Sequence, residues 1–174
     1  DILASPKDPR QASKIDKNCI EVLLNTLSSY YDVILIDTNH ILDMHNMIAF
    51  EYSDRILNVF TNDALDLKGT KTFISICKNI GVDNLVLALN NALDNRKNYF
   101  SNYDIKGVIK ANIDYVIPAS LYIKNYDSYV VDGTLLKTLL RLKITSRRGY
   151  AEAEKLALKL LEVSKKEELR NEEK

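Results

Sequence analysis

The stretch NLVLALNN, residues 84–91, is the clearest strand in the sequence. Its apolar residues follow one another without polar interruption, between a polar turn and a pair of asparagines. A strand that is apolar on both faces is typical of a parallel sheet covered by helices on both sides. Because ligands of such sheets gather at the carboxyl ends of the strands, Asn90 and Asn91 become candidate site residues.

Similar segments lie on either side of this stretch. Apolar runs at 33–36 and 55–60 come before it, and a short run at 115–117, closed by Pro118, comes after it. Residues 1–4 are typical of a further short strand. Apolar residues at helical spacing occupy the connections between these strands. The order predicts an α/β fold with a parallel sheet, helices on both faces in three αβα layers, and extra helices at the C-terminus.

The predicted helices have recognisable starts and stops. Asp8 and Pro9 would begin a helix whose apolar positions continue to Leu27, and Asp63 would cap a helix that stops at Gly81. Further helices are predicted at 41–51, 103–109, 120–130, 133–142 and 147–169.

Composition limits the class of protein. The chain has 174 residues, of which 46% are hydrophobic and 28% charged, as in an ordinary globular domain. A formal net charge of zero argues against a general nucleic-acid binder, which carries a basic excess. Cys19 and Cys77 both lie in apolar helical patterns, which favours reduced thiols that fill a core in a cytoplasmic protein. No apolar run is long enough to span a bilayer.

The sequence predicts an α/β body over 1–145 and a C-terminal amphipathic helix with a charged tail over 146–174. That helix mixes both charge signs around an apolar stripe, which favours packing on the body, or pairing with a second copy or a protein partner, over binding to a membrane surface. The chain begins at Asp1 rather than at Met and enters a strand-like segment at once. We therefore expect it to be part of a larger protein.

Asp37 and Thr38 directly follow the apolar run at 33–36. An aspartate at the end of a buried strand can hold a Mg²⁺-bound water beside nucleotide phosphates, or it can simply cap the next turn. His40 and His45 are five positions apart and have no cysteine cluster near them, so a polar helix face is favoured over a metal site.

The succession of motifs resembles the MinD/ParA family of deviant P-loop ATPases over about residues 1–142, and within it the pilus-assembly branch known as CpaE or TadZ. The motifs are DILASPKDP (1–9), YDVILIDT (31–38), SDRILNVFTNDALDLKGTK (53–71), NLVLALNN (84–91) and YVIP (115–118). The resemblance implies that Asp37 orders the Mg²⁺ shell through water and that Thr38 begins the second switch. It also implies that the adenine base is bound by four residues: Asn90, Asn91, Ile117 and Pro118.

The resemblance implies ATP or ADP and Mg²⁺ as cofactors. A P-loop needs a glycine-rich turn followed by Lys and Ser or Thr, and none of the five glycines here is followed by Lys. In the family this loop lies upstream, so we expect nucleotide and Mg²⁺ to bind only together with an N-terminal part, and the chain alone not to hydrolyse ATP. The run Thr38-Asn39-His40 also departs from the Pro or Gly that relatives carry after the acid.

Three functions stay open. The first is an ATP-dependent, homodimeric protein that positions pilus or secretion machinery from the cytoplasm, at the cell pole or the inner membrane surface. The second is a scaffold derived from an ATPase that binds protein partners without turnover. The third is a receiver-like domain with Asp37 as phosphoacceptor and Thr61 as its switch residue, although the first strand lacks an acidic pair and the last strand ends in Asn90 and Asn91 rather than Lys.

Overall fold

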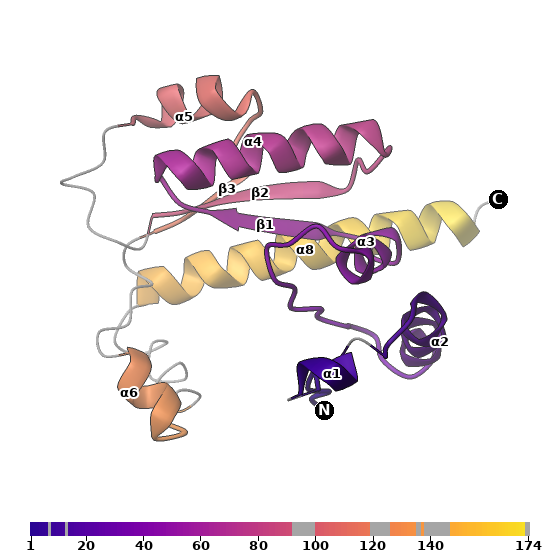
Figure 1. Ribbon diagram of the computed structural model, residues 1–174. Coiled ribbons are helices and arrows are strands. Elements are labelled where there is room, and N and C mark those ends of the chain that lie inside the picture. Colours follow the sequence, from indigo (N-terminus) through magenta and orange to yellow (C-terminus); the bar gives the residue numbers. More distant parts are fainter. Residues whose placement is uncertain are drawn as a thin grey trace. The chain divides into compact units, whose positions relative to one another are not determined.

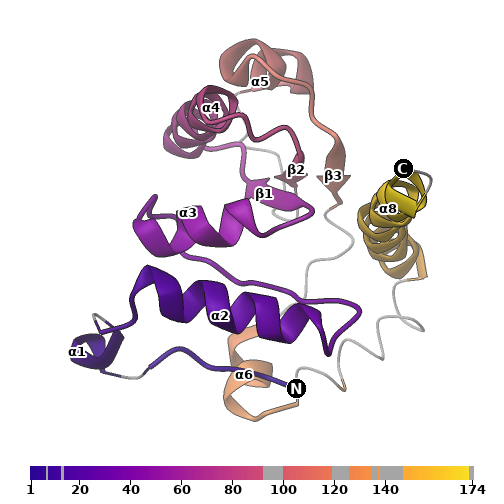
Figure 2. The ribbon, with the colours of Figure 1, turned by 90° about the vertical axis from the view of Figure 1, so that its right-hand side faces the viewer.

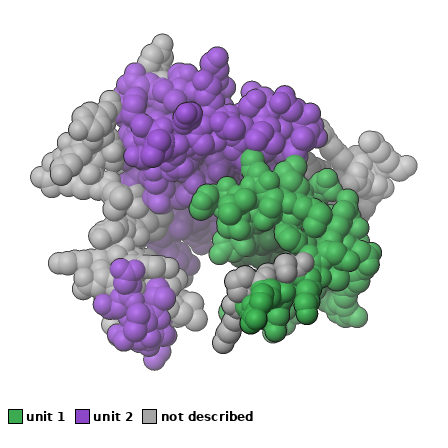
Figure 3. Space-filling model, in the orientation of Figure 1, with its two compact units in different colours: residues 1–54 green, residues 55–174 purple. Residues whose placement is uncertain are grey.

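The computed structural model describes residues 1–6, 8–12, 14–91, 100–118, 126–134, 137 and 147–172. The chain divides into two compact units, residues 1–54 and residues 55–174, shown in two colours in Figure 3. Within the described residues, the first unit is helical and irregular, whereas the second holds every strand. The predicted boundary at residue 145 stays a prediction.

The second unit is built on a parallel sheet of three strands in the order β1-β2-β3 (Figure 1). The strands are β1 (Ile56–Phe60), β2 (Leu85–Asn90) and β3 (Tyr115–Ile117). The central strand is the one that is apolar on both faces, and Leu87, Ala88 and Leu89 are all buried. The predicted strands at 55–60, at 85–89 within the stretch 84–91, and at 115–117 are therefore confirmed.

One face of the sheet is covered by α4 (Ala64–Asn79) and α5 (Asn102–Ile109). The buried cluster between these layers contains Phe60, Leu67, Ile74, Leu87, Leu89, Ile105 and Ile109. Cys77 of α4 is also buried, and burial raises the pKa of its thiol, so it behaves as the neutral core residue that was predicted.

The opposite face of β3 carries α8 (Arg147–Glu172). The Tyr115 hydroxyl donates a hydrogen bond to the carbonyl of Glu152 in α8, whereas the next residue, Val116, packs against the cluster under α4 and α5. Because successive strand residues point to opposite faces, α8 and α4 lie on different sides of the sheet, as Figures 1 and 2 show. The predicted layering with helices on both faces is confirmed.

Two of the helix ends agree with the caps read from the sequence. The Asp63 carboxylate accepts hydrogen bonds from the backbone N–H groups of Leu65 and Asp66, and Gly81, just after α4, has a φ of +78°. A further helix, α6, covers Tyr126–Val131. The helix predicted at 133–142 lies largely outside the described residues. No helix in the described part of the chain is both long and apolar enough to cross a bilayer.

Among its described residues, the first unit has three helices, α1 (Pro9–Ala12), α2 (Lys17–Ser28) and α3 (Met44–Glu51). The single helix predicted after Asp8 is divided, because the Asp16 carboxylate accepts the N–H of Cys19 and starts α2 anew. Cys19 is exposed, so its predicted place in a core is wrong.

The strands predicted at 1–4 and 33–36 are absent, because both segments are irregular. Leu35 is 92% exposed and Val33 is 55% exposed, so the run at 33–36 is not buried as predicted. An apolar run becomes a strand only when another strand satisfies its backbone N–H and C=O groups. Neither segment finds such a partner among the described residues, and sequence periodicity does not supply one.

Candidate functional site

The carboxyl edge of the sheet brings four predicted site residues together. Asn90 pairs with Ile117 in the register of β2 and β3. The N–H of Asn91 then donates a 2.9 Å hydrogen bond to the carbonyl of Ile117, so the contact continues one residue beyond β2. Pro118 follows directly, and all four residues are half-buried. The structure therefore makes neighbours of residues that lie about 27 positions apart in the sequence.

The local sequence explains this arrangement. Pro118 has no N–H to donate, so β3 ends there and leaves an apolar ring at the edge of the sheet. Each asparagine carboxamide offers two donors and two acceptor lone pairs. Carboxamide groups next to an apolar surface can bind a planar ring: the carboxamides hydrogen-bond to polar groups at its edge, and the apolar surface contacts its face.

The loop between β1 and α4 satisfies its own polar groups. The backbone N–H and the hydroxyl of Thr61 both donate to one carboxylate oxygen of Asp66, at 2.6 and 2.8 Å. Asp63 caps the same helix end. With two carboxylates already at the N-terminus of α4, its helix dipole is complemented internally and a phosphate would meet negative charge there.

Asn62 belongs to this edge; the sequence marks it as a strand end, but it was not among the predicted site residues. Its carboxamide nitrogen donates a 2.9 Å hydrogen bond to the carbonyl of Phe100, just before the Ser101–Asp104 capping box that starts α5. Its Oδ1 atom is buried and has no hydrogen-bond partner in the part of the chain that the structure describes. The signal was available, because Asn62 stands two residues after β1.

Asp37 and Thr38 lie in the first unit, where both are exposed in the irregular segment that ends near α3. The prediction that Asp37 ends a buried strand is wrong, since 33–36 forms no strand. This removes the buried strand end from which both roles of Asp37 were argued, the Mg²⁺-binding one and the receiver phosphoacceptor one. Across the described ranges, no group of three or more His, Cys, Asp or Glu side chains is placed to hold a metal ion.

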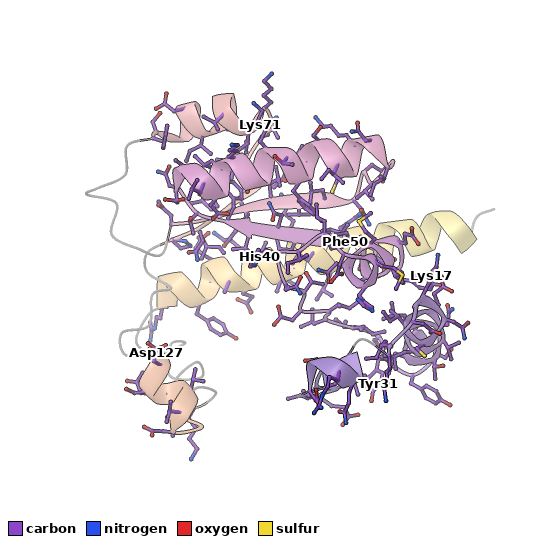
Figure 4. All side chains as sticks on the ribbon, viewed as in Figure 1. Lys17, Tyr31, His40, Phe50, Lys71 and Asp127 are labelled. Atoms are coloured by element: carbon purple, nitrogen blue, oxygen red, sulfur yellow. The ribbon has the colours of Figure 1, made fainter. Side chains whose placement is uncertain are left out.

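The two histidines have different surroundings. His40 is exposed in the loop before α3 and is labelled in Figure 4. His45 lies on α3, with its Nε2 atom 2.9 Å from the carbonyl oxygen of Ile15 and its Nδ1 atom 3.9 Å from an Asp43 carboxylate oxygen. His45 thus ties α3 to the loop before α2, whereas the sequence predicted a polar helix face for both.

Comparison with known structures identifies the architecture. The crystal structure of a ParA family ATPase from Chlorobium tepidum TLS matches this chain with a TM-score of 0.73. The fold is that of a ParA ATPase. The match covers 90% of this chain and 62% of the ParA chain at 19% sequence identity, a level at which the likeness shows the fold alone. No protein-family model and no curated protein matches the sequence. The predicted P-loop NTPase-like α/β fold is confirmed by this ParA-like architecture.

Proposed function

We propose that this chain carries the base-binding part of a ParA-like, ATP-dependent protein. The observation that supports this best is the placement of Asn90 and Asn91 beside Ile117 and Pro118 at the carboxyl edge of a ParA-like sheet. The side-chain amide of Asn90 would exchange hydrogen bonds with the N6/N7 edge of adenine, as an asparagine does with that base in DNA. Ile117 and Pro118 would pack against the face of the ring.

The described residues offer little that would bind the phosphate groups of the nucleotide. The sequence has no glycine-rich turn with Lys and Ser or Thr, and the N-terminus of α4 is occupied by Asp63 and Asp66. Asp37 would contribute a carboxylate for a Mg²⁺-bound water, and Thr38 the start of a switch. We therefore propose that nucleotide binds only together with an N-terminal part that supplies the phosphate site, and that this chain alone does not hydrolyse ATP.

The cellular role in this proposal is that of the pilus-assembly branch of the family. A homodimer would act in the cytoplasm and be recruited to the cell pole or the inner membrane surface, where it would position pilus or secretion machinery. Support for this finer assignment is limited to the succession of sequence motifs, together with the ParA-like fold.

Thermal unfolding with and without nucleotide tests the proposal. A ligand that binds only the native protein raises its stability, so millimolar ATP with Mg²⁺ should raise the Tm of the intact wild-type protein, with the N-terminal part that nucleotide binding requires. Asn90→Ala should reduce the Tm shift caused by ATP. It should also reduce the difference between the Tm shifts caused by ATP and by GTP. Asn112→Ala, at an exposed asparagine before β3, is the control and should respond as the wild type does. Equal shifts with ATP and GTP in the wild type would contradict adenine recognition by Asn90.

The second candidate is a scaffold that has the ATPase fold without turnover. The internally satisfied N-terminus of α4 and the missing glycine-lysine motif favour it. An unchanged Tm at millimolar ATP with Mg²⁺, in a protein that unfolds cooperatively, would select the scaffold over the nucleotide-binding protein.

A further inference from the structure

Asn46 is a buried polar residue at the base of the turn that follows Asp37 and Thr38. It lies in α3 and is 8% exposed. Its Nδ2 atom donates to Asn39 Oδ1 at 2.7 Å and also faces the backbone carbonyl oxygens of Asn39, at 3.3 Å, and of Ile41. Because all three surrounding atoms are acceptors, the carboxamide must turn its NH₂ group toward them. One side chain thus holds both the backbone and the side chain of Asn39.

A second layer of hydrogen bonds closes the same turn. The Oδ1 atom of Asn39 also accepts the backbone N–H of Ile41 at 2.9 Å. The Asp43 carboxylate accepts the backbone N–H of Asn46 at 2.9 Å and so caps α3. The turn is therefore fixed at its start by Asn39, in its middle by Ile41 and at its end by the helix cap.

The burial pattern of the turn separates inward from outward groups. Asp37, Thr38 and His40 are exposed, whereas Asn46 beneath them is buried. A buried carboxamide is tolerated only when it is hydrogen-bonded, so the inward group maintains the turn while the outward groups remain accessible. Asn39 is two residues from Asp37, so moving its peptide also moves the backbone that carries the acid.

We propose that Asn46 is a positioning residue that sets the turn after Asp37 before any ligand is bound. The role of Asp37 toward Mg²⁺ rests on the proposed function, but the preset turn does not. Nucleotide switches commonly work by ordering a mobile segment against the terminal phosphate and its Mg²⁺. The turn from Asn39 to Asn46, which begins two residues after Asp37, is already held by its own side chains and does not gain order from the nucleotide.

Amide exchange in the nucleotide-free, intact chain tests the preset turn. In the wild type, the N–H groups of Ile41 and Asn46 should exchange slowly. Asn46→Leu keeps the branched shape and the number of side-chain non-hydrogen atoms but removes the donors, and should speed exchange at Ile41 by about tenfold, the effect of about one lost hydrogen bond. Asn18→Leu, at an exposed asparagine of α2, is the matched control and should leave Ile41 unchanged. If Asn46→Leu does not fold, Asn46→Ala also removes the donors and needs less room, and it should give the same result; Asn39→Ala is unsuitable because Asn39 Oδ1 itself accepts the Ile41 N–H. Unchanged exchange at Ile41 in the folded variant overturns the proposal.

Nucleotide titration separates positioning from simple structural support. Wild-type ATP affinity should rise when Mg²⁺ is added, and Asn46→Leu should reduce that Mg²⁺-dependent gain by about tenfold while ATP affinity without Mg²⁺ stays the same. If Asn46→Leu lowers ATP affinity equally with and without Mg²⁺, Asn46 only supports the fold. That result would overturn its role as a positioning residue. A more than severalfold slowing of Ile41 exchange on adding MgATP to the wild type would overturn the preset turn. If the wild type binds no ATP, the proposed function fails, and the exchange experiment alone decides the role of Asn46.

Discussion

Asn58 is an asparagine in the middle of a strand whose neighbours are apolar. In the register of the sheet it lies opposite Leu87, so it shares the face that α4 and α5 cover. Its Nδ2 atom is buried and has no hydrogen-bond partner among the residues that the structure describes. A buried donor without a partner costs about 1–3 kcal/mol, so Asn58 lowers the stability of the sheet on which the base site depends.

Replacing this residue should stabilise the protein. Asn58→Val removes the buried donor and introduces a β-branched residue suited to a strand, so the free energy of unfolding should rise by about 1 kcal/mol. Urea denaturation followed by circular dichroism measures the change. Asn112→Val, at an exposed position, is the control and should change stability little. A loss of stability in Asn58→Val would mean that the native carboxamide is hydrogen-bonded after all.

Single residues also show what the sequence could and could not predict about the site. Asn90 and Asn91 were predicted because they stand at the end of an apolar run, and parallel strands present such ends at one edge, whereas Ile117 and Pro118 were predicted to bind the base from the family resemblance. Asn46 was missed because its role depends on its hydrogen-bond partners, whereas for Asn62 the strand end could be predicted and only its partner could not. The carboxamide of Asn62 bonds to residue 100, and no periodicity in the sequence announces that contact.

At the scale of elements, Tyr115 links β3 to α8 through its hydroxyl. The hydroxyl of Tyr115 donates to the carbonyl of Glu152, and Lys159 of α8 reaches the carbonyl of Asp114 at 3.5 Å. Burial of the phenol, and then the nearby charge of Glu152, raise the pKa of Tyr115 above its usual range. The native state therefore favours the protonated hydroxyl that makes the bond.

Tyr115→Phe should weaken the protein in a pH-dependent way. At neutral pH the variant should lose about 1 kcal/mol of stability with the hydrogen bond. Because the folded pKa is raised, the contribution of Tyr115 is fully present below the unfolded pKa of ~10 and is lost as pH rises through the folded pKa. The stability difference between wild type and variant should therefore shrink above pH ~10, as denaturant titrations from neutral to alkaline pH can measure. Tyr30→Phe, at a tyrosine that is 78% exposed, is the control. A difference that stays constant with pH would contradict the proposed coupling.

Most elements could be predicted, because their signals are local. The cap at Asp63, the glycine after α4 and the apolar run of β2 each act within a few residues of their own position. The run at 33–36 carries the same apolar signal as β2 but finds no strand to pair with among the described residues. Strand pairing depends on residues that are distant in the sequence. Two apolar runs with the same local pattern can therefore adopt different structures, one a strand and the other irregular.

At the scale of the whole molecule, exposed apolar side chains concentrate in one stretch. Between α2 and α3 lie several large apolar residues of this kind: Tyr30, Tyr31, Val33, Leu35, Ile36, Ile41 and Leu42. By contrast, Phe60 of β1 is 1% exposed and Leu89 of β2 is 1% exposed. The backbone of the irregular stretch is open to a protease, because no regular hydrogen-bonded structure protects it.

Limited digestion with chymotrypsin should show this difference. The first cuts among the described residues should follow Tyr30, Tyr31 or Leu35, whereas sites in β1, β2 and β3 should survive longer. Mass spectrometry of early time points identifies the cut positions. Leu35→Asp should remove one early cut and leave the others, which controls for nonspecific digestion. Cleavage after Phe60 as early as after Leu35 would contradict the expected order.

The order of the sheet also bears on how the protein is made. Each strand pairs with the next strand along the chain, Ile56 with Leu85 and Ala88 with Tyr115. At roughly 5–20 residues per second, a ribosome delivers each new strand a few seconds after its partner. The sheet can therefore grow in the direction of synthesis, one strand at a time, without waiting for a distant segment. Among the described strands β3 emerges last and receives α8, so this helix packs on a strand that has already been translated.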